Sequence, residues 1–134
     1  MLGMNPEQQI LLTQKVMHHL KEWGLSAEQQ IMVLDLPKDI KSRHLRAYHE
    51  NTPFPDTAEV EYRVIRLLGI IDALRTTYPT NALMAGRWIK TRHKRMDNRT
   101  PLLTMLQDGG DGVTAVLAEL DCTYAWDLSG SVNK

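Results

Sequence analysis

The sequence predicts an all-α protein, and three observations support this. Apolar residues recur every three or four positions over most of the chain, which is the period of an amphipathic helix. Helix-capping residues precede several of these runs, and proline or glycine follows them. Alternation of apolar and polar residues never extends beyond a few positions, so no strand is expected. The chain has 134 residues, 43% of them hydrophobic, which is enough for one domain or for two helical halves.

The first two helices have defined starts and ends. Asn5-Pro6 is a cap followed by a proline at the first helical position, and Gly24 stops the helix that follows. Ser26-Ala27-Glu28-Gln29 has the form of a capping box and begins a second, short helix that closes near Asp35-Leu36-Pro37. The apolar face of the first helix consists of Leu12, Val16, Leu20 and Trp23.

A third, basic helix is predicted over residues 38–49. Ile40, Leu45 and Tyr48 share one side of it, and lysine and arginine residues occupy the others. Two prolines in residues 51–55 must end it.

The most buried helix is predicted to begin after Thr57 and to run to about Thr76. Its apolar stripe is wider than a helix with a single buried side requires, so the helix should lie at the centre of the fold. Tyr78-Pro79 ends it. The predicted core residues are Val64, Leu67, Leu68 and Ile71.

Three shorter helices complete the chain. Asn81 can cap one that runs through Trp88-Ile89, and Thr100-Pro101 is again a cap followed by proline. The glycine-rich residues 108–112 should separate that helix from the last one. The apolar face of the last helix consists of Val113, Val116, Leu117 and Leu120.

Composition and motifs limit the classes of function. No basic segment precedes an apolar run at the start, and no apolar run approaches the length of a membrane span, so we expect a cytoplasmic protein without membrane contact. Cys122 is the single cysteine, which excludes an internal disulfide. No histidine has the partner spacing of a helical metal site, and no phosphate loop or serine elbow occurs. We therefore expect no enzyme, no cofactor and no metal.

Two segments have the character of binding elements. Residues 26–48 are predicted to form a helix, a short turn and a basic helix, an arrangement that suits a DNA-recognition element. The same arrangement is also common in helical domains that do not bind DNA. The tail after Leu120 places Tyr124, Trp126 and Leu128 in a segment too short for a core of its own. Such aromatic residues either fold back onto the domain or insert into a partner. The candidate DNA contacts are Lys38, Lys41, Ser42, Arg43 and Arg46.

The charges are unevenly placed although the net charge is zero. Residues 87–99 contain six lysines or arginines and one acid, Asp97. Acidic residues dominate from Asp108 to Asp127. Two interpretations stay open, a solvated pair of helix faces or a basic collar that binds a partner.

The sequence resembles the Xre/MbcA/ParS antitoxins. Trp23-Gly24-Leu25-Ser26 through Pro53-Phe54-Pro55 resembles their Xre-like helix-turn-helix half. Trp88-Ile89, then Arg99-Thr100-Pro101-Leu102, and the closing helix resemble their toxin-binding half. The sequence departs from the family pattern at two places. The turn that usually carries a small residue or glycine is Asp35-Leu36-Pro37 here, and Arg92-His93 stands where a Pro-Asn pair is common. The resemblance covers roughly residues 22–122.

The resemblance implies a type II antitoxin with a helix-turn-helix half at residues 1–78 and a toxin-binding half with a C-terminal tail at residues 79–134. It also implies a homodimer or higher oligomer and a protein toxin as partner, commonly a RES-domain enzyme that consumes NAD. The tail would cover the toxin's active site, and operator DNA is a further expected partner. The alternative is a helix-turn-helix transcriptional regulator without a toxin. The implied toxin-binding residues are Tyr124, Trp126, Asp127 and Leu128, with Arg92 and Arg95 beside them.

Overall fold

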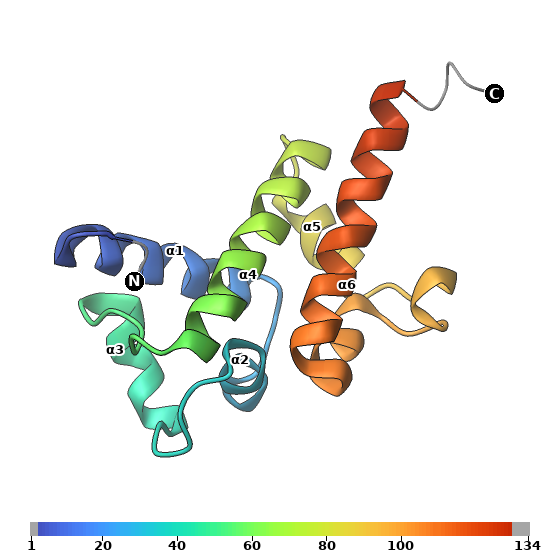
Figure 1. The fold of residues 1–134 in the computed structure, drawn as a ribbon. Helices are drawn as coiled ribbons and strands as arrows, with labels where there is room; N and C mark the ends of the chain where they lie inside the picture. Colours follow the sequence, from blue (N-terminus) through green and yellow to red (C-terminus); the bar gives the residue numbers. More distant parts are fainter. Residues whose placement is uncertain (1–2, 130–134) are drawn as a thin grey trace. The chain divides into compact units, whose positions relative to one another are not determined.

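The computed structural model describes residues 3–129, and the side chains of these residues apart from Ala82 and residues 122–129. Within this range the chain forms six α-helices, two short 3-10 helices and no strand (Figure 1). The predicted all-α fold class is confirmed. The α-helices are α1 (Pro6–Glu22), α2 (Ala27–Leu34), α3 (Leu45–Glu50), α4 (Ala58–Thr77), α5 (Ala82–Ile89) and α6 (Pro101–Ser129), and the 3-10 helices are η1 (Ser42–His44) and η2 (Lys94–Met96).

The chain divides into two compact units, Met1–Ile65 and Arg66–Lys134. The first unit contains α1, α2, η1, α3 and the beginning of α4. The second contains the rest of α4, α5, η2 and α6. The division therefore falls inside α4, whereas the sequence places the boundary between the two functional halves after residue 78.

Capping boxes begin the first two helices, as predicted. The Asn5 side chain accepts a hydrogen bond from the Gln8 backbone N–H at 2.8 Å, and the Gln8 side chain accepts one from the Asn5 backbone at 3.1 Å. Ser26 and Gln29 form the same reciprocal pair, at 3.2 and 2.8 Å. Each pair satisfies two backbone donors at a helix end, which stabilises the start of the helix.

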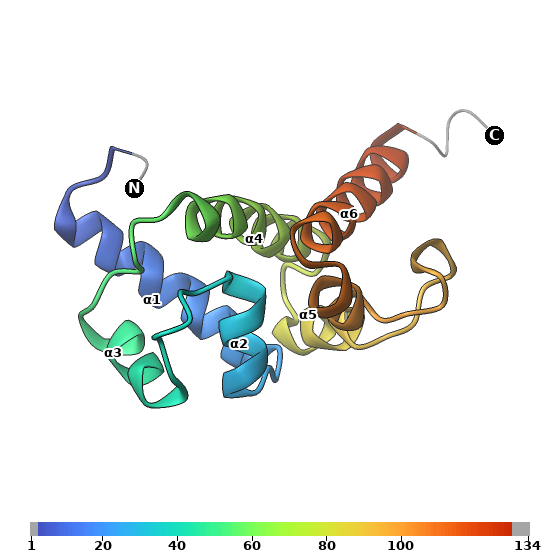
Figure 2. The same cartoon turned by 60° about the horizontal axis from the view of Figure 1, so that its bottom comes forward.

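The core of the first unit lies where α1 packs on its neighbours, and Figure 2 shows α1 beside α3. Thr13, which is buried, donates to the Gln9 carbonyl at 2.8 Å and accepts from the Phe54 backbone N–H at 3.0 Å. The hydroxyl thus ties the segment after α3 to the middle of α1. The buried apolar side chains of α1 and α2 are Val16, Met17, Leu20, Val33 and Leu34. Trp23, directly after α1, is also buried.

The basic helix predicted over residues 38–49 begins later than expected. The backbone N–H of Ile40 donates to the Pro37 carbonyl at 3.0 Å, so residues 37–40 form a turn. The His44 ring then accepts from the Lys41 backbone N–H at 2.8 Å, which caps η1. Only from Leu45 is the backbone α-helical, and α3 is six residues long. The prediction is wrong for residues 38–41.

Helix α4 carries the long buried stripe that its spacing predicts. Thr57 accepts a hydrogen bond from the Val60 backbone N–H at 3.2 Å and so caps the helix. Of the four predicted core residues, Val64, Leu67 and Ile71 are buried, while Leu68 is half-buried at the edge of the stripe. The remaining buried residues of α4 are Val60, Ile70 and Leu74.

Helix α6 consists of two helical segments that meet at one residue. Gly109 has φ 61° and ψ −132°, a conformation essentially restricted to glycine, and the residues on both sides of it are helical. The predicted separator of five residues, 108–112, is therefore a single-residue break. Gly112 permits this because a Cβ atom there would lie 2.2 Å from the Thr104 carbonyl oxygen in the first segment.

The segment expected to be a tail continues α6 instead. The backbone remains helical through Ser129, so residues 124–128 lie on the same helix as Val113 and Val116. Figure 1 shows the last turns of α6 extending beyond the end of α4 within the second unit. The side chains of the four predicted toxin-binding residues in this segment, Tyr124, Trp126, Asp127 and Leu128, lie outside the described residues.

Candidate binding surfaces

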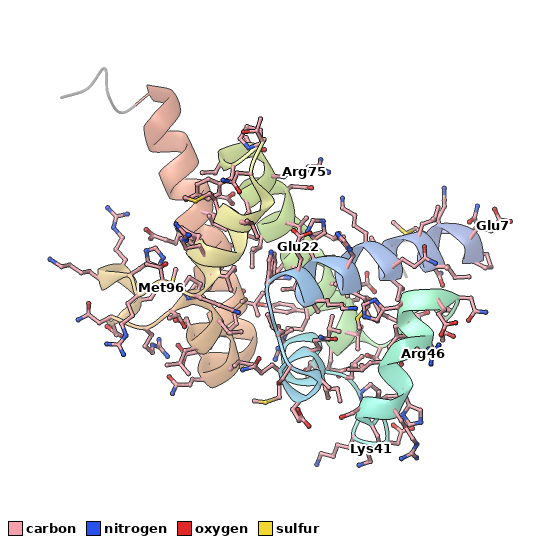
Figure 3. The ribbon with its side chains drawn as sticks, turned by 180° about the vertical axis from the view of Figure 1, so that it is seen from behind. Glu7, Glu22, Lys41, Arg46, Arg75 and Met96 are labelled. Carbon is pink, nitrogen blue, oxygen red and sulfur yellow. The ribbon has the colours of Figure 1, made fainter. Side chains whose placement is uncertain are left out.

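The candidate DNA contacts lie on an irregular surface of the first unit. Lys38 and Lys41 lie in the segment between α2 and η1. Ser42 and Arg43 belong to η1, and only Arg46 lies on α3. All five side chains are exposed. Figure 3 shows Lys41 at the end of this segment and Arg46 further along it. Arg46 is paired with Glu50 at 3.2 Å, so part of the positive charge of α3 is neutralised within the helix.

The other side of α3 packs against α1. The Tyr48 and Phe54 rings have centroids 5.4 Å apart, and burial, assisted by Asp39, raises the pKa of Tyr48. Burial also lowers the pKa of His49, and the nearby Lys21 and His18 lower it further. Burial in the packing of α3, together with these neighbouring charges, accounts for both pKa shifts.

The turn after α2 differs from a short helix-turn-helix connection. Asp35 closes α2 in the left-handed conformation, with φ 53°. Arg63 of α4 donates to the carbonyl oxygens of Met32 and Val33, at 3.2 and 3.1 Å, and so satisfies the end of α2. Residues 35–41 then separate α2 from η1. The predicted recognition helix, α3, is thus short and does not follow α2 directly, because residues 35–41 and η1 lie between them.

The second candidate surface is the segment that joins α5 to α6, residues 90–99, here named the basic loop. The loop closes on itself: the His93 N–H donates to the Arg99 carbonyl, and the Asn98 N–H donates to the His93 carbonyl, both at 3.1 Å. Asp97 and Asn98 both have left-handed backbones, with φ 57° and 61°. Asparagine and aspartate adopt this conformation more readily than other non-glycine residues, so these two residues suit the tight reversal.

The His93 side chain holds the start of the loop against α5. Its ring lies 4.9 Å from that of Trp88, and its Nε2 is 3.3 Å from the Trp88 carbonyl oxygen. The backbone of His93 is extended, with φ −130° and ψ 134°. This contact explains why Trp88 is half-buried although the loop itself is exposed.

Arg99 fastens the other end of the loop to α6. Its guanidinium donates to both carboxylate oxygens of Asp108, at 2.7 and 3.0 Å, and to the Gln107 side chain at 3.1 Å. Its Nε donates to the Met96 carbonyl within the loop at 3.2 Å. The bond from Arg99 lowers the pKa of Asp108, and the same bond raises the pKa of Arg99. A bidentate arginine–carboxylate pair is geometrically specific as well as stable.

Replacing Asp108 with asparagine is expected to remove one acid-sensitive component of stability. Because Arg99 lowers the pKa of Asp108 in the folded protein, the ionised carboxylate stabilises the fold above about pH 4 and loses this effect as the pH falls through the lowered pKa. Between neutral pH and strong acid, the free energy of unfolding measured in urea should therefore fall more for wild type than for the variant. Asp111→Asn, an exposed change on the same helix, is the control and should retain the wild-type pH dependence.

The two arginines predicted beside the toxin contacts have different surroundings. Arg95 lies 3.7 Å from Glu119 of α6, which links the loop to the last helix a second time. Arg92 is exposed, and no carboxylate among the described side chains lies within ion-pair distance of it. The sequence interpretation missed the Arg99–Asp108 pair. Its only sequence signal is an acid nine residues after an arginine, which is too common to be informative.

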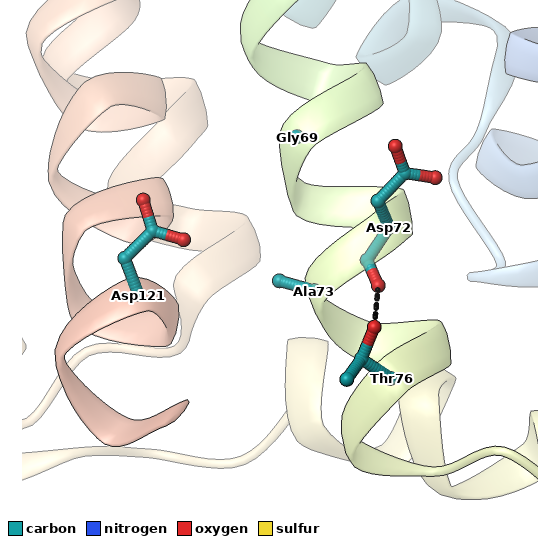
Figure 4. A pocket seen from close by; sticks show the side chains of 5 residues that line it. All are labelled: Gly69, Asp72, Ala73, Thr76 and Asp121. Atoms are coloured by element: carbon teal, nitrogen blue, oxygen red, sulfur yellow. Dashed lines mark hydrogen bonds between the residues drawn. The ribbon is translucent and has the colours of Figure 1, made fainter. Parts of the chain in front are cut away.

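A small hollow of about 220 Å³ lies between α4 and α6 in the second unit (Figure 4). The small residues Gly69 and Ala73 of α4 leave room for it, and Asp121 of α6 points toward it in Figure 4. Asp72 and Thr76 also line it. Thr76 donates to the Asp72 carbonyl at 2.9 Å, and the Asp72 carboxylate lies 3.9 Å from Arg75. Small residues at a helix crossing account for the hollow. In the part of the chain that the structure describes, no three metal-ligating side chains form a cluster.

Neither a scan against models of known protein families nor a search among curated proteins finds a match to this sequence. Over the described residues, none of the helices is both long and apolar enough to span a bilayer.

Proposed function

We propose that this chain is the antitoxin of a type II toxin–antitoxin pair, a protein that binds a partner enzyme and inhibits it. The observation that carries the proposal is the continuation of α6. Its helical backbone runs on to Ser129, nine residues beyond the buried Leu120. Nine further residues correspond to about 13 Å of helix. A projecting helix of this length is a suitable element for insertion into a groove of a partner.

The toxin-binding surface in this proposal is the end of α6 together with Arg92 and Arg95. Tyr124 and Trp126 supply aromatic anchors, the residue types that dominate protein interfaces. Leu128 adds apolar area, and Asp127 supplies an acceptor for arginines in a cleft that binds a pyrophosphate. The resemblance to the Xre/MbcA/ParS antitoxins makes a RES-domain enzyme that consumes NAD the expected toxin, and its cleft the expected target.

Self-association and DNA binding belong to the same proposal. A homodimer is the simplest form for a soluble helical protein of this kind. Exposed Lys38, Lys41 and Arg43 in the first unit support operator binding and autoregulation. They equally support the alternative function, a transcriptional regulator without a toxin partner.

Ending the chain after Cys122 is expected to abolish protection against the toxin. The truncated protein keeps every described buried side chain and should therefore stay folded. It loses two aromatic anchors, each worth about 2 kcal/mol or more, so binding should weaken about 1,000-fold. The wild-type protein and the truncated protein are each co-expressed with the product of the neighbouring reading frame, and surviving colonies are counted.

Leu83→Ala is the matched control, because Leu83 is an apolar side chain on α5 that is 82% exposed and lies outside the proposed surface. It should protect like wild type. A truncated protein that is folded by circular dichroism and still protects cells would refute the inhibitory role of the end of α6. If the neighbouring product is harmless when expressed alone, the antitoxin proposal itself fails.

A further inference from the structure

Four cations at the end of α5 and the start of the basic loop have no neutralising partner among the described side chains. They are Arg87, Lys90, Arg92 and Lys94, here named the basic arc, and all four are exposed. The other two cations of this segment are matched: Arg95 lies 3.7 Å from Glu119, and Arg99 is bonded to Asp108 at 2.7 Å. Four positive charges within eight residues therefore remain available to a partner.

The backbone directs the middle of the arc outward. His93 is extended, and successive side chains of an extended segment point to opposite sides. Because the His93 ring turns inward onto Trp88, the preceding Arg92 projects to the other side, and Lys94, the first residue of η2, is likewise exposed. Figure 3 shows nitrogen-tipped side chains extending outward from the loop around Met96. Met96 itself is buried and anchors the loop from within.

The loop that presents the arc is held in one conformation. Backbone hydrogen bonds from His93 to Arg99 and from Asn98 to His93 close it, and Arg99 joins it to α6 through Asp108 and Gln107. A fixed backbone reduces the conformational entropy that is lost on binding. The side chains stay exposed, so they can adapt to the positions of the charges they meet.

From this geometry we propose that the basic arc binds the phosphate backbone of nucleic acid without reading its sequence. Between Arg87 and Arg99 no large apolar side chain is exposed, whereas protein interfaces depend on a desolvated apolar or aromatic centre. Phosphate binding needs only accessible cations and derives its free energy from counterion release. Lysine and arginine with no exposed large apolar side chain between them therefore match a polyanionic backbone better than a folded protein surface.

The arc is a stronger polyanion site than the surface that the sequence assigns to DNA. In the first unit, Arg46 is neutralised by Glu50, and Asp39 lies among the remaining cations. The arc contains no acid between Arg87 and Lys94. The second unit thus supplies the dominant phosphate contacts, even where the first unit also touches DNA.

The test uses the full-length protein and a fluorescent DNA duplex of arbitrary sequence, about two helical turns long. Four phosphate contacts predict a slope of about −3.5 for log K against log salt, so affinity should fall on the order of 100-fold between about 50 and 200 mM salt. In Arg92→Ala/Lys94→Ala the slope should shrink to about −2 and the loss to about 10-fold. Arg92→Lys/Lys94→Arg, which preserves both charges, should restore the wild-type slope.

Lys21→Ala/Arg75→Ala removes two exposed cations elsewhere, of which Arg75 lies 3.9 Å from Asp72, and should leave the slope unchanged. The proposal is overturned if the duplex does not bind at low salt, or if Lys41→Ala/Arg43→Ala reduces the slope while the arc variant does not. Tighter binding of polyglutamate than of the duplex would overturn it in favour of an acidic protein partner. Arg92 also belongs to the proposed toxin contacts, but no toxin is present in this experiment, so its outcome is independent of the proposed function.

Discussion

Trp23→Ala is expected to destabilise the first unit by about 3 to 5 kcal/mol, the range for removing a buried large aromatic side chain. The Trp23 side chain is 1% exposed and stands at the end of α1, where the chain turns through Gly24 into α2. Its loss leaves a cavity in a close-packed core, which cannot collapse freely to fill the space. Urea unfolding followed by circular dichroism measures the change.

The control for this substitution is Trp23→Phe, which keeps an aromatic ring and a smaller part of the volume. Trp23→Phe should lower the free energy of unfolding clearly less than Trp23→Ala does, because the cavity is smaller. A loss below about 1 kcal/mol for Trp23→Ala would mean that the side chain is not part of a close-packed core.

Gly112→Ala is expected to destabilise the second unit by about 3 kcal/mol, the upper end of the usual cost of overpacking. The added Cβ would lie 2.2 Å from the Thr104 oxygen and 2.9 Å from its carbonyl carbon. Both are backbone atoms, so relief requires the two segments of α6 to move apart. This outweighs the gain of about 1 kcal/mol that alanine otherwise brings inside a helix.

Gly69→Ala is the matched control on α4. There the new Cβ would meet Leu117 Cδ1 at 2.9 Å, the far end of a flexible side chain that can rotate away. The change should therefore be close to neutral in the same unfolding measurement. If Gly112→Ala proved as mild as Gly69→Ala, the close approach of the two segments would be wrong.

The helix starts could be predicted because their causes are local. Asn5 with Gln8 and Ser26 with Gln29 are pairs three residues apart, and Asn81 bonds the Leu83 N–H two residues later. Each can be recognised within one turn of chain. The stripe through Val64, Leu67 and Ile71 is likewise visible in the spacing of apolar residues.

The elements that escaped prediction depend on interactions that spacing does not show. The start of α3 moved because the turn at Pro37 takes up residues that could equally continue a helix. The break in α6 needs only Gly109, because Gly112 lets the two segments approach, a contact between residues eight apart. Arg99 bonds Asp108, which lies nine residues later at the end of the first segment of α6, a pairing that helical spacing does not indicate. Tertiary geometry therefore decides these features.

Because α6 continues as one helix beyond Leu120, its length sets both the distance and the direction of its last residues. From Gly110 to Ser129 the backbone is a single helix, and each residue advances it by about 1.5 Å and turns it by about 100°. One residue gained or lost after Leu120 would therefore rotate segment 124–128 by about 100° relative to the start of the helix, whereas seven residues gained would nearly restore its direction about 10 Å further out. If the proposed function holds, natural variation in the length of this segment should occur in steps of whole heptads, each matched by a deeper or shallower cleft in the toxin.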